Sequence, residues 1–306
     1  MRLDDFDPND IDVGSQDNRG GGFGGFGGGG GGGLLFGLLP LIGSRFGCAG
    51  IAVVLALMLF FGGGLSSITG GGSTDAPVSR SAPAGTQGGG AASICNAQPA
   101  RRATCNAFYS AQETWETLLA RQGTTFQKPS LEFFDQNGRS GCGAAQAAMG
   151  PFYCPTDSSI YIDTTFFDEL VNRFRAAGDF AQYYVVAHEF GHHIQNLTGA
   201  SQRVQEIQRS SGRAEGNAAS VRLELQADCY AGVWAAQNRQ RLEQGDIEEG
   251  LRAAQAIGDD TLQREATGNV NQEGFTHGTS AQRMHWLKVG LDTGDPARCD
   301  TFNGAI

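Results

Sequence analysis

Several common sequence patterns are missing from this chain of 306 residues. No C-x-x-C pair occurs, so the sequence does not predict a structural zinc ribbon. Its 47 glycines do not follow the G-X-Y period of collagen. Basic residues are outnumbered, 22 Lys and Arg against 32 Asp and Glu, and the formal net charge of −10 argues against a nucleic-acid-binding protein. Histidine is scarce, with five residues and none before position 188.

Long apolar runs are lacking as well, except between residues 34 and 63. Within this segment, residues 46–62 carry no charge and reach the lower length limit for a helix that spans a bilayer. We predict one transmembrane anchor at 34–63, in contact with membrane lipid; a buried core helix and a cleaved signal are the alternatives. The acidic and glycine-rich residues 1–33 are predicted to be disordered, residues 64–92 to form a flexible linker, and residues 93–306 to fold.

Basic residues beside the apolar segment predict its orientation. Arg19 and Arg45 precede it, whereas the first basic residue after it is Arg80. Because the cytoplasmic flanks of membrane helices are enriched in Lys and Arg, we predict a single-pass protein with a cytoplasmic N-terminus. Residues 64–306, with the folded domain, would then lie on the extracytoplasmic side of the cell membrane.

Six of the seven cysteines follow the apolar segment, as expected for three disulfide bonds in an oxidising compartment. Fifteen pairings of six cysteines are possible. Short sequence separations favour two particular pairs and leave a third pair, which would fix the C-terminal tail to a predicted helix. The hypothesis is therefore three disulfide bonds, Cys95–Cys105, Cys142–Cys154 and Cys229–Cys299.

The chain after residue 93 predicts a mostly helical α+β domain with one small sheet. The short run 158–163 is β-branched and aromatic at its centre, which predicts a strand. Gly199 is suited to end a helix. Apolar residues at helical spacing predict helices at 104–122, 179–199, 218–243 and 280–291.

The motif H-E-x-x-H stands at His188, Glu189 and His192, inside the predicted helix 179–199. Residues four apart lie on one face of a helix, so both imidazoles can bind one metal ion, and Zn²⁺ suits such ligands. Glu189 lies beside them, where a carboxylate can take a proton from the attacking water. Because this short string also arises by chance, the motif needs a third ligand elsewhere in the chain to support it.

That third ligand does not follow the motif directly. The longer metzincin motif requires glycine and histidine where this chain has Gln195 and Thr198. Glu224 and Asp228 are four residues apart on the predicted helix 218–243 and therefore share a face. We predict Glu224 as the third zinc ligand and Asp228 as the acceptor for the free ring N–H of a ligand histidine. A solvated acidic helix face is the alternative.

His277 lies in a predicted loop just before the helix at 280–291, and Arg283 lies in the first turn of that helix. Zinc peptidases need a donor for the oxyanion that forms when water attacks the carbonyl. We predict that His277, supported by Arg283, supplies this donor; a surface histidine beside a capped helix start is the alternative. His193 is predicted to be structural, and His285 is predicted to be a surface or core histidine outside the site.

Five segments resemble the bacterial neutral zinc metallopeptidase family, and the resemblance spans residues 95–303. The segments are His188–Gln195, Glu224–Trp234, Thr276–Arg283, Met149–Pro155 and Tyr161–Phe167. The anchored N-terminus is similar to that family too. The resemblance implies a zincin-like metallopeptidase fold, a Zn²⁺ cofactor and peptide or protein substrates. The order H-E-x-x-H, E-x-x-x-D, T-H-x…R also resembles the gluzincins of the CAAX prenyl-protease type, which implies active-site roles for His277 and Arg283.

The sequence therefore predicts a zinc-dependent peptidase that is anchored at the membrane and has no nucleic-acid partner. By fold analogy, the strand at 160–163 is expected to be the sheet edge that pairs with an extended peptide. A non-proteolytic zinc-binding or scaffolding domain of the cell envelope is one alternative, although it would not need Glu189. A metal-free domain with its histidines in the core is the other.

Overall fold

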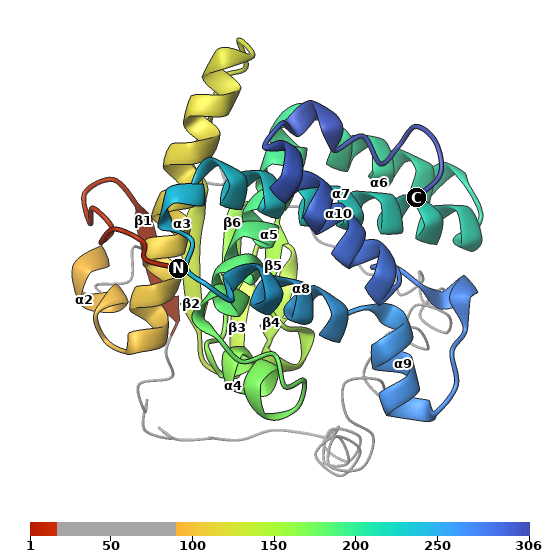
Figure 1. Ribbon diagram of the computed structural model, residues 1–306, viewed down its shortest axis with the longest axis horizontal. Coiled ribbons are helices and arrows are strands. Elements are labelled where there is room, and N and C mark those ends of the chain that lie inside the picture. The colour runs from red at the N-terminus through yellow and green to blue at the C-terminus, as the bar shows by residue number, and fades with distance from the viewer. Residues whose placement is uncertain (17–89) are drawn as a thin grey trace, which may run out of the picture. The chain divides into compact units, whose positions relative to one another are not determined.

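The computed structural model describes residues 1–16 and 90–306, which belong to one compact unit (Figure 1). Helices predominate, and the strands form a four-stranded sheet and a separate hairpin, so the predicted mostly helical α+β class is confirmed. The helices are α2 (Ala91–Cys95), α3 (Pro99–Arg121), α4 (Thr165–Asn172), α5 (Asp179–Thr198), α6 (Ala200–Ser210), α7 (Arg213–Gln237), α8 (Asp246–Ala256), α9 (Asp259–Thr267) and α10 (Ser280–Thr293). The strands are β1 (Asp12–Gln16), β2 (Ser130–Phe134), β3 (Asn137–Ser140), β4 (Gly143–Gln146), β5 (Phe152–Cys154) and β6 (Ser159–Ile162).

Local sequence signals fix the ends of the two helices that matter most for the site. Helix α5 follows Gly178, at φ 128°, and stops at Gly199, at φ 87°; both backbone conformations favour glycine. Helix α10 begins with a capping box between Thr279 and Gln282. The helices predicted at 179–199 and 280–291 are therefore confirmed. Helix α7 spans Arg213–Gln237, so it begins and ends about five residues before the predicted helix at 218–243. Its first turn lies ahead of the apolar residues from which that helix was predicted.

The four-stranded sheet has the order β1-β2-β6-β5. Strands β1, β2 and β6 are parallel, and β5 pairs antiparallel with β6. The strand predicted at 158–163 is β6. Its expected position at the sheet edge is wrong, because β6 is paired on both sides and β5 forms that edge instead. The cause is β5, a three-residue strand that is too short to give an alternating pattern.

Residues 1–16 are part of this unit, so the prediction of disorder over 1–33 is wrong for these residues. Strand β1 pairs with β2 along its whole length, and Met1, Phe6 and Ile11 are buried in the main core. In Figure 1 the segment, drawn in red, lies beside α2 and α3. The acidic, glycine-rich composition suggested a solvated tail. Composition gives no information about pairing with a strand that lies about a hundred residues further along the chain. The folded chain also resumes by Ala91, before the predicted boundary at residue 93.

Helices α7 and α10 pack against each other with almost no space between their backbones (Figure 1). A Cβ atom at Gly232 would lie 2.2 Å from the carbonyl oxygen of Leu287, and one at Gly290 would lie 2.0 Å from that of Cys229. The disulfide between Cys229 and Cys299 joins α7 to the C-terminal tail at the same place. The three predicted disulfide pairings are confirmed.

Within residues 1–16 and 90–306, no helix is both long and apolar enough to cross a membrane. The anchor predicted at 34–63 and most of the linker predicted at 64–92 lie outside these residues.

The close crossing of α7 and α10 generates a stability prediction. Gly290→Ala should lower the free energy of unfolding by about 1–3 kcal/mol, because the new methyl group meets backbone atoms that have no room to move. Gly216→Ala, also in α7, is the matched control: its Cβ would lie 3.5 Å from Gln208, an ordinary contact, and alanine favours the helix. Urea unfolding of the full-length oxidised protein measures both, and equal stabilities of the two variants would contradict the close packing.

Candidate metal centre

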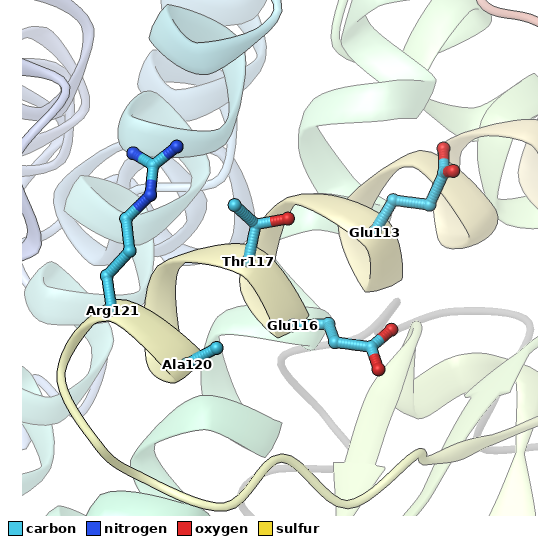
Figure 2. Close-up of a pocket in the computed structure, with 5 residues that line it drawn as sticks. All are labelled: Glu113, Glu116, Thr117, Ala120 and Arg121. Carbon is cyan, nitrogen blue, oxygen red and sulfur yellow. The ribbon is translucent and has the colours of Figure 1, made fainter.

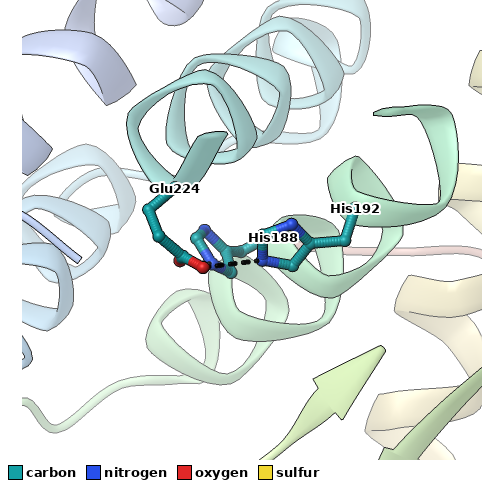
Figure 3. A group of neighbouring side chains, drawn as sticks. All are labelled: His188, His192 and Glu224. Atoms are coloured by element: carbon teal, nitrogen blue, oxygen red, sulfur yellow. Dashed lines mark hydrogen bonds and ion pairs between the residues drawn. The ribbon is translucent and has the colours of Figure 1, made fainter. Parts of the chain in front are cut away.

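Two helices bring three potential ligands together (Figure 3). His188 and His192 extend from α5, and Glu224 extends from α7 toward both imidazoles. His188 Nε2 lies 3.1 Å from Glu224 Oε2, and His192 Nε2 lies 3.5 Å from Glu224 Oε1. One ligand atom from each residue falls within 4.8 Å of the others, so all three can reach one ion at the usual zinc–ligand distance of about 2 Å.

Both histidines are oriented by hydrogen bonds at their other ring nitrogen. His188 Nδ1 donates to Asp228 Oδ1 at 2.9 Å, and His192 Nδ1 donates to Gln195 Oε1 at 2.8 Å. Each bond keeps a proton on Nδ1, so Nε2, which faces Glu224, is the nitrogen that can bind an ion. Asp228 therefore lies where its predicted role requires. Gln195 was missed, although it stands one turn after His192 on the same face of α5.

Asp228 is completely buried and accepts four hydrogen bonds. Beyond the one from His188, they come from the Tyr184 hydroxyl at 2.6 Å and from Arg283 Nε and Nη2 at 2.8 and 2.9 Å. Although burial favours the neutral acid, Arg283 and His188 hold the pKa of the Asp228 carboxyl at about 2, so it stays ionised. The aspartate thus links α5, α7 and α10 at a single point.

Arg283 lies in the first turn of α10, as predicted, and its side chain contacts Asp228. Its side chain is buried and donates to Asp228, to the Ile257 carbonyl and to the Tyr184 hydroxyl, and its Nη2 lies 3.4 Å from His188 Nδ1. These contacts direct the guanidinium toward Asp228 and leave little of it for a substrate oxyanion. Sequence spacing placed Arg283 near the site but did not show which carboxylate it faces.

Glycine in the H-E-x-x-H helix allows α5 and α7 to approach at the site. A Cβ atom at Gly191 would lie 3.1 Å from the carbonyl oxygen of Ala227 and 3.2 Å from its Cα. Gln195 adds a polar link across the same interface, because its Nε2 donates to the Leu223 carbonyl at 2.7 Å, next to Glu224. The ligands of the two helices are therefore held by backbone packing and by one buried amide.

Glu189 is buried beside the ligands, with 7% of its surface exposed. Among the residues that the structure describes, none forms a hydrogen bond with its carboxylate. Burial raises the pKa of this carboxyl, and Glu224 acts in the same direction, while His188 and His192 oppose them. A carboxylate that is desolvated and has no hydrogen-bond donor accepts a proton readily, as a general base must.

The electrostatics of the site favour a bound cation. Burial disfavours a charged His192, yet Glu224 raises the pKa of this ring to about 9. The histidines in turn lower the pKa of Glu224 in spite of its burial. The site holds three carboxylates, those of Glu189, Glu224 and Asp228, and a dication with two imidazole ligands and one carboxylate would take the place of the protons on the two rings.

A second group of acidic side chains, Asp179, Asp246 and Glu249, could also approach one ion. It contains no histidine, and the Met1 amino nitrogen lies 2.9 Å from Asp246 Oδ1. Zinc prefers nitrogen and sulfur ligands, so the histidine-containing group is the better zinc site.

His277 lies in the loop before α10, as predicted, and its side chain is about half exposed at 49%. Asp259, the first residue of α9, holds the loop, because its Oδ2 accepts hydrogen bonds from the backbone N–H groups of Thr276, His277 and Gly278. Asp259 also accepts from His277 Nδ1 at 3.2 Å, so Nε2 carries a proton that it can donate when the ring is charged. Partial desolvation opposes charging of the ring, but Asp259 and Glu224 raise the pKa of His277. Asp259 carried no sequence signal, because its partners lie in a loop 17 to 19 residues away.

The two remaining histidines differ in environment. His193 is fully buried; its Nε2 donates to the Gln127 carbonyl at 2.6 Å, and its Nδ1 accepts from the Tyr153 hydroxyl at 3.1 Å. Burial lowers the pKa of His193 to about 4, so this ring is neutral and ties α5 to strand β5. His285 is exposed and packs edge-on against Trp286.

A shallow depression elsewhere on the surface contains no ligand of this site. Figure 2 shows that its lining consists of residues along one face of α3. The lining residues are Glu113, Glu116, Thr117, Ala120 and Arg121.

The chain belongs to the family described as "Putative neutral zinc metallopeptidase", whose model matches residues 11–302. It is 49% identical over 213 residues to uncharacterized protein YpfJ of Escherichia coli strain K12, covering 69% of this chain and 74% of that protein. It is 45% identical over 210 residues to uncharacterized protein Rv2575 of Mycobacterium tuberculosis strain H37Rv, covering 64% of this chain and 68% of that protein. No solved structure matches the chain, so the zincin-like fold stays a prediction. Family membership implies Zn²⁺ as the cofactor.

Gln195 provides a test of the metal centre that is independent of catalysis. Gln195→Leu should weaken zinc binding about 10- to 100-fold, because His192 loses the acceptor that orients its ring. Gln112→Leu is the control, since Gln112 is equally buried but contacts Asp10. Competition with a zinc chelator at fixed pH gives both affinities. An unchanged affinity in Gln195→Leu, beside a loss in Glu224→Gln, would show that Gln195 does not position the ligand.

Proposed function

We propose that this protein is a zinc-dependent peptidase that hydrolyses peptide bonds with Glu189 as the general base. The observation that supports it most strongly is the convergence of His188, His192 and Glu224 next to a buried carboxylate that has no hydrogen-bond donor of its own. A site that only stored or sensed zinc would need the three ligands but not this base.

When bound, zinc would lower the pKa of a water molecule and polarise the substrate carbonyl. His188, His192 and Glu224 would hold the ion, and Asp228 with Gln195 would keep the two imidazoles in their binding tautomers. Glu189 would take the proton of the attacking water and pass it to the leaving amine. Arg283 would act through Asp228, by keeping that buried carboxylate ionised.

His277 is the proposed donor to the oxyanion of the substrate. Asp259 accepts from Nδ1 and orients the ring, so the charged ring would present Nε2–H to an incoming oxygen, as an oxyanion donor requires. For the substrate backbone we propose β5 as the pairing strand, because this edge of the four-stranded sheet has no partner among the described residues. Strand β5 is also tied to the H-E-x-x-H helix through Tyr153 and His193.

We propose an oxidising, extracytoplasmic location for residues 90–306. Three disulfides support it, since such bonds are rare in reducing compartments. Attachment to the cell membrane through the apolar residues 34–63 completes this proposal.

The central prediction separates zinc binding from catalysis. Full-length protein should cleave members of a peptide library, lose this activity to a chelator and regain it with Zn²⁺. Glu189→Gln should keep its zinc and lose activity about a hundredfold or more, because the base is removed while the ligands stay. Zinc content by mass spectrometry and cleavage by liquid chromatography measure the two effects.

Three outcomes discriminate between the alternatives. Full activity in Glu189→Gln would contradict the mechanism. Bound zinc with no cleavage of any peptide would favour a non-proteolytic zinc-binding or scaffolding domain. Protein without zinc after purification and reconstitution would favour a metal-free domain.

His277→Ala should lower kcat about 10- to 1,000-fold with zinc content unchanged, as expected for loss of an oxyanion donor. His285→Ala is the matched control, because His285 is an exposed histidine on α10 that packs against Trp286. If both variants keep the wild-type rate, His277 is a surface residue. A loss of zinc in His277→Ala would instead make it a ligand.

A further inference from the structure

Strand β1 supplies one edge of the four-stranded sheet. Its five residues, Asp12 to Gln16, pair in register with Ser130 to Phe134 of β2. Without β1, strand β2 would become the edge and expose the backbone N–H and C=O groups that β1 now satisfies. Ser130 Oγ adds a side-chain bond to Asp12 Oδ2 at 2.7 Å across this pair.

The residues before β1 contribute to the main core of the domain. Phe6 is 8% exposed and Ile11 is 6% exposed, and both belong to the same apolar cluster as Phe108 and Trp115 of α3. The Phe6 backbone N–H donates to Asn106 Oδ1 at 3.1 Å. This segment therefore buries apolar side chains that it could not bury by itself.

Charged side chains of the segment match those of the domain. Asp5 forms an ion pair with Arg102 of α3 at 2.8 Å, and Asp10 pairs with Lys128. Gln112 of α3 donates to Asp10 as well. Asp5 and Asp10 are thus each paired with basic or polar partners on the surface that the segment covers.

Gly14 and Glu132 fit each other at the centre of the strand pair. A Cβ atom at Gly14 would lie 2.3 Å from Glu132 Oε1, so the Glu132 carboxyl lies directly against the backbone of β1 and would have to move for a larger residue. Burial, followed by the nearby Asp12 and Asp157 carboxylates, raises the pKa of Glu132 to about 7. The Glu132 side chain of β2 is therefore partly buried against β1.

We infer that residues 1–16 are an integral part of the domain and lie in the same compartment as residues 90–306. Backbone pairing, core burial and ion pairing all require direct contact, which two segments on opposite faces of a bilayer cannot make. A membrane segment that crossed once between residues 16 and 90 would separate them. The inference therefore replaces the cytoplasmic N-terminus that the positions of Arg19 and Arg45 predict.

Thiol labelling in intact cells tests the inference. Asn9→Cys and Glu116→Cys place a thiol at exposed positions of the segment and of α3, each in full-length protein with Cys48→Ser. A membrane-impermeant maleimide should label both to the same extent, with the same change on membrane disruption, because both face one compartment. Labelling of position 116 in intact cells, with position 9 reacting only after disruption, would overturn the inference.

Cross-linking tests the contact itself and is read by mass, so it does not depend on peptidase activity. In the same background, Asp10→Cys with Lys128→Cys should be joined by a short bis-maleimide in cells. Asp10→Cys with Lys288→Cys is the control, since Lys288 is also an exposed lysine but pairs with Asp292 within α10. Equal yields for the two pairs, or no product from the first while both of its thiols label, would contradict the docking of residues 1–16.

Discussion

The buried ion pair between Asp228 and Arg283 is the interaction on which the site depends. It joins α7 to α10, and through the His188 ring and the Tyr184 hydroxyl it also joins both helices to α5. Removal of one partner from such a pair commonly costs about 3–5 kcal/mol, because the other charge is left buried and unpaired. The same carboxylate fixes the tautomer of a proposed zinc ligand. Stability of the helix packing and orientation of the ligand therefore rest on one group.

Close backbone packing makes that arrangement rigid. Gly191 lets α5 approach α7, and Gly232 with Gly290 lets α7 approach α10. The Cys229–Cys299 disulfide holds the C-terminal tail against the same helix. Ligands that extend from such closely packed helices lose little freedom when they bind an ion, which favours tight binding. By contrast, His277 lies in a loop, and hydrogen bonds from its backbone N–H and its ring to Asp259 hold it in place instead of helix packing.

The sheet connects the metal centre with the beginning of the chain. Strand β5, at one edge, contacts α5 through Tyr153 and His193, whereas β1 closes the opposite edge. One edge is thus filled by the protein's own residues, and the other has no partner among residues 1–16 and 90–306. Residues 1–16 protect the edge of β2, and β5 is the strand that we propose for pairing with the substrate.

The sequence by itself determined the features that follow from helical periodicity. Residues four apart share a helix face wherever the helix lies, so His188 and His192, and likewise Glu224 and Asp228, could be paired in advance. Only the tertiary structure decided that Arg283 faces Asp228 and that residues 1–16 pair with β2. These contacts join positions 55 and more than 100 residues apart, and composition or spacing along the chain carries no information about which distant partner a charge or a strand edge will meet.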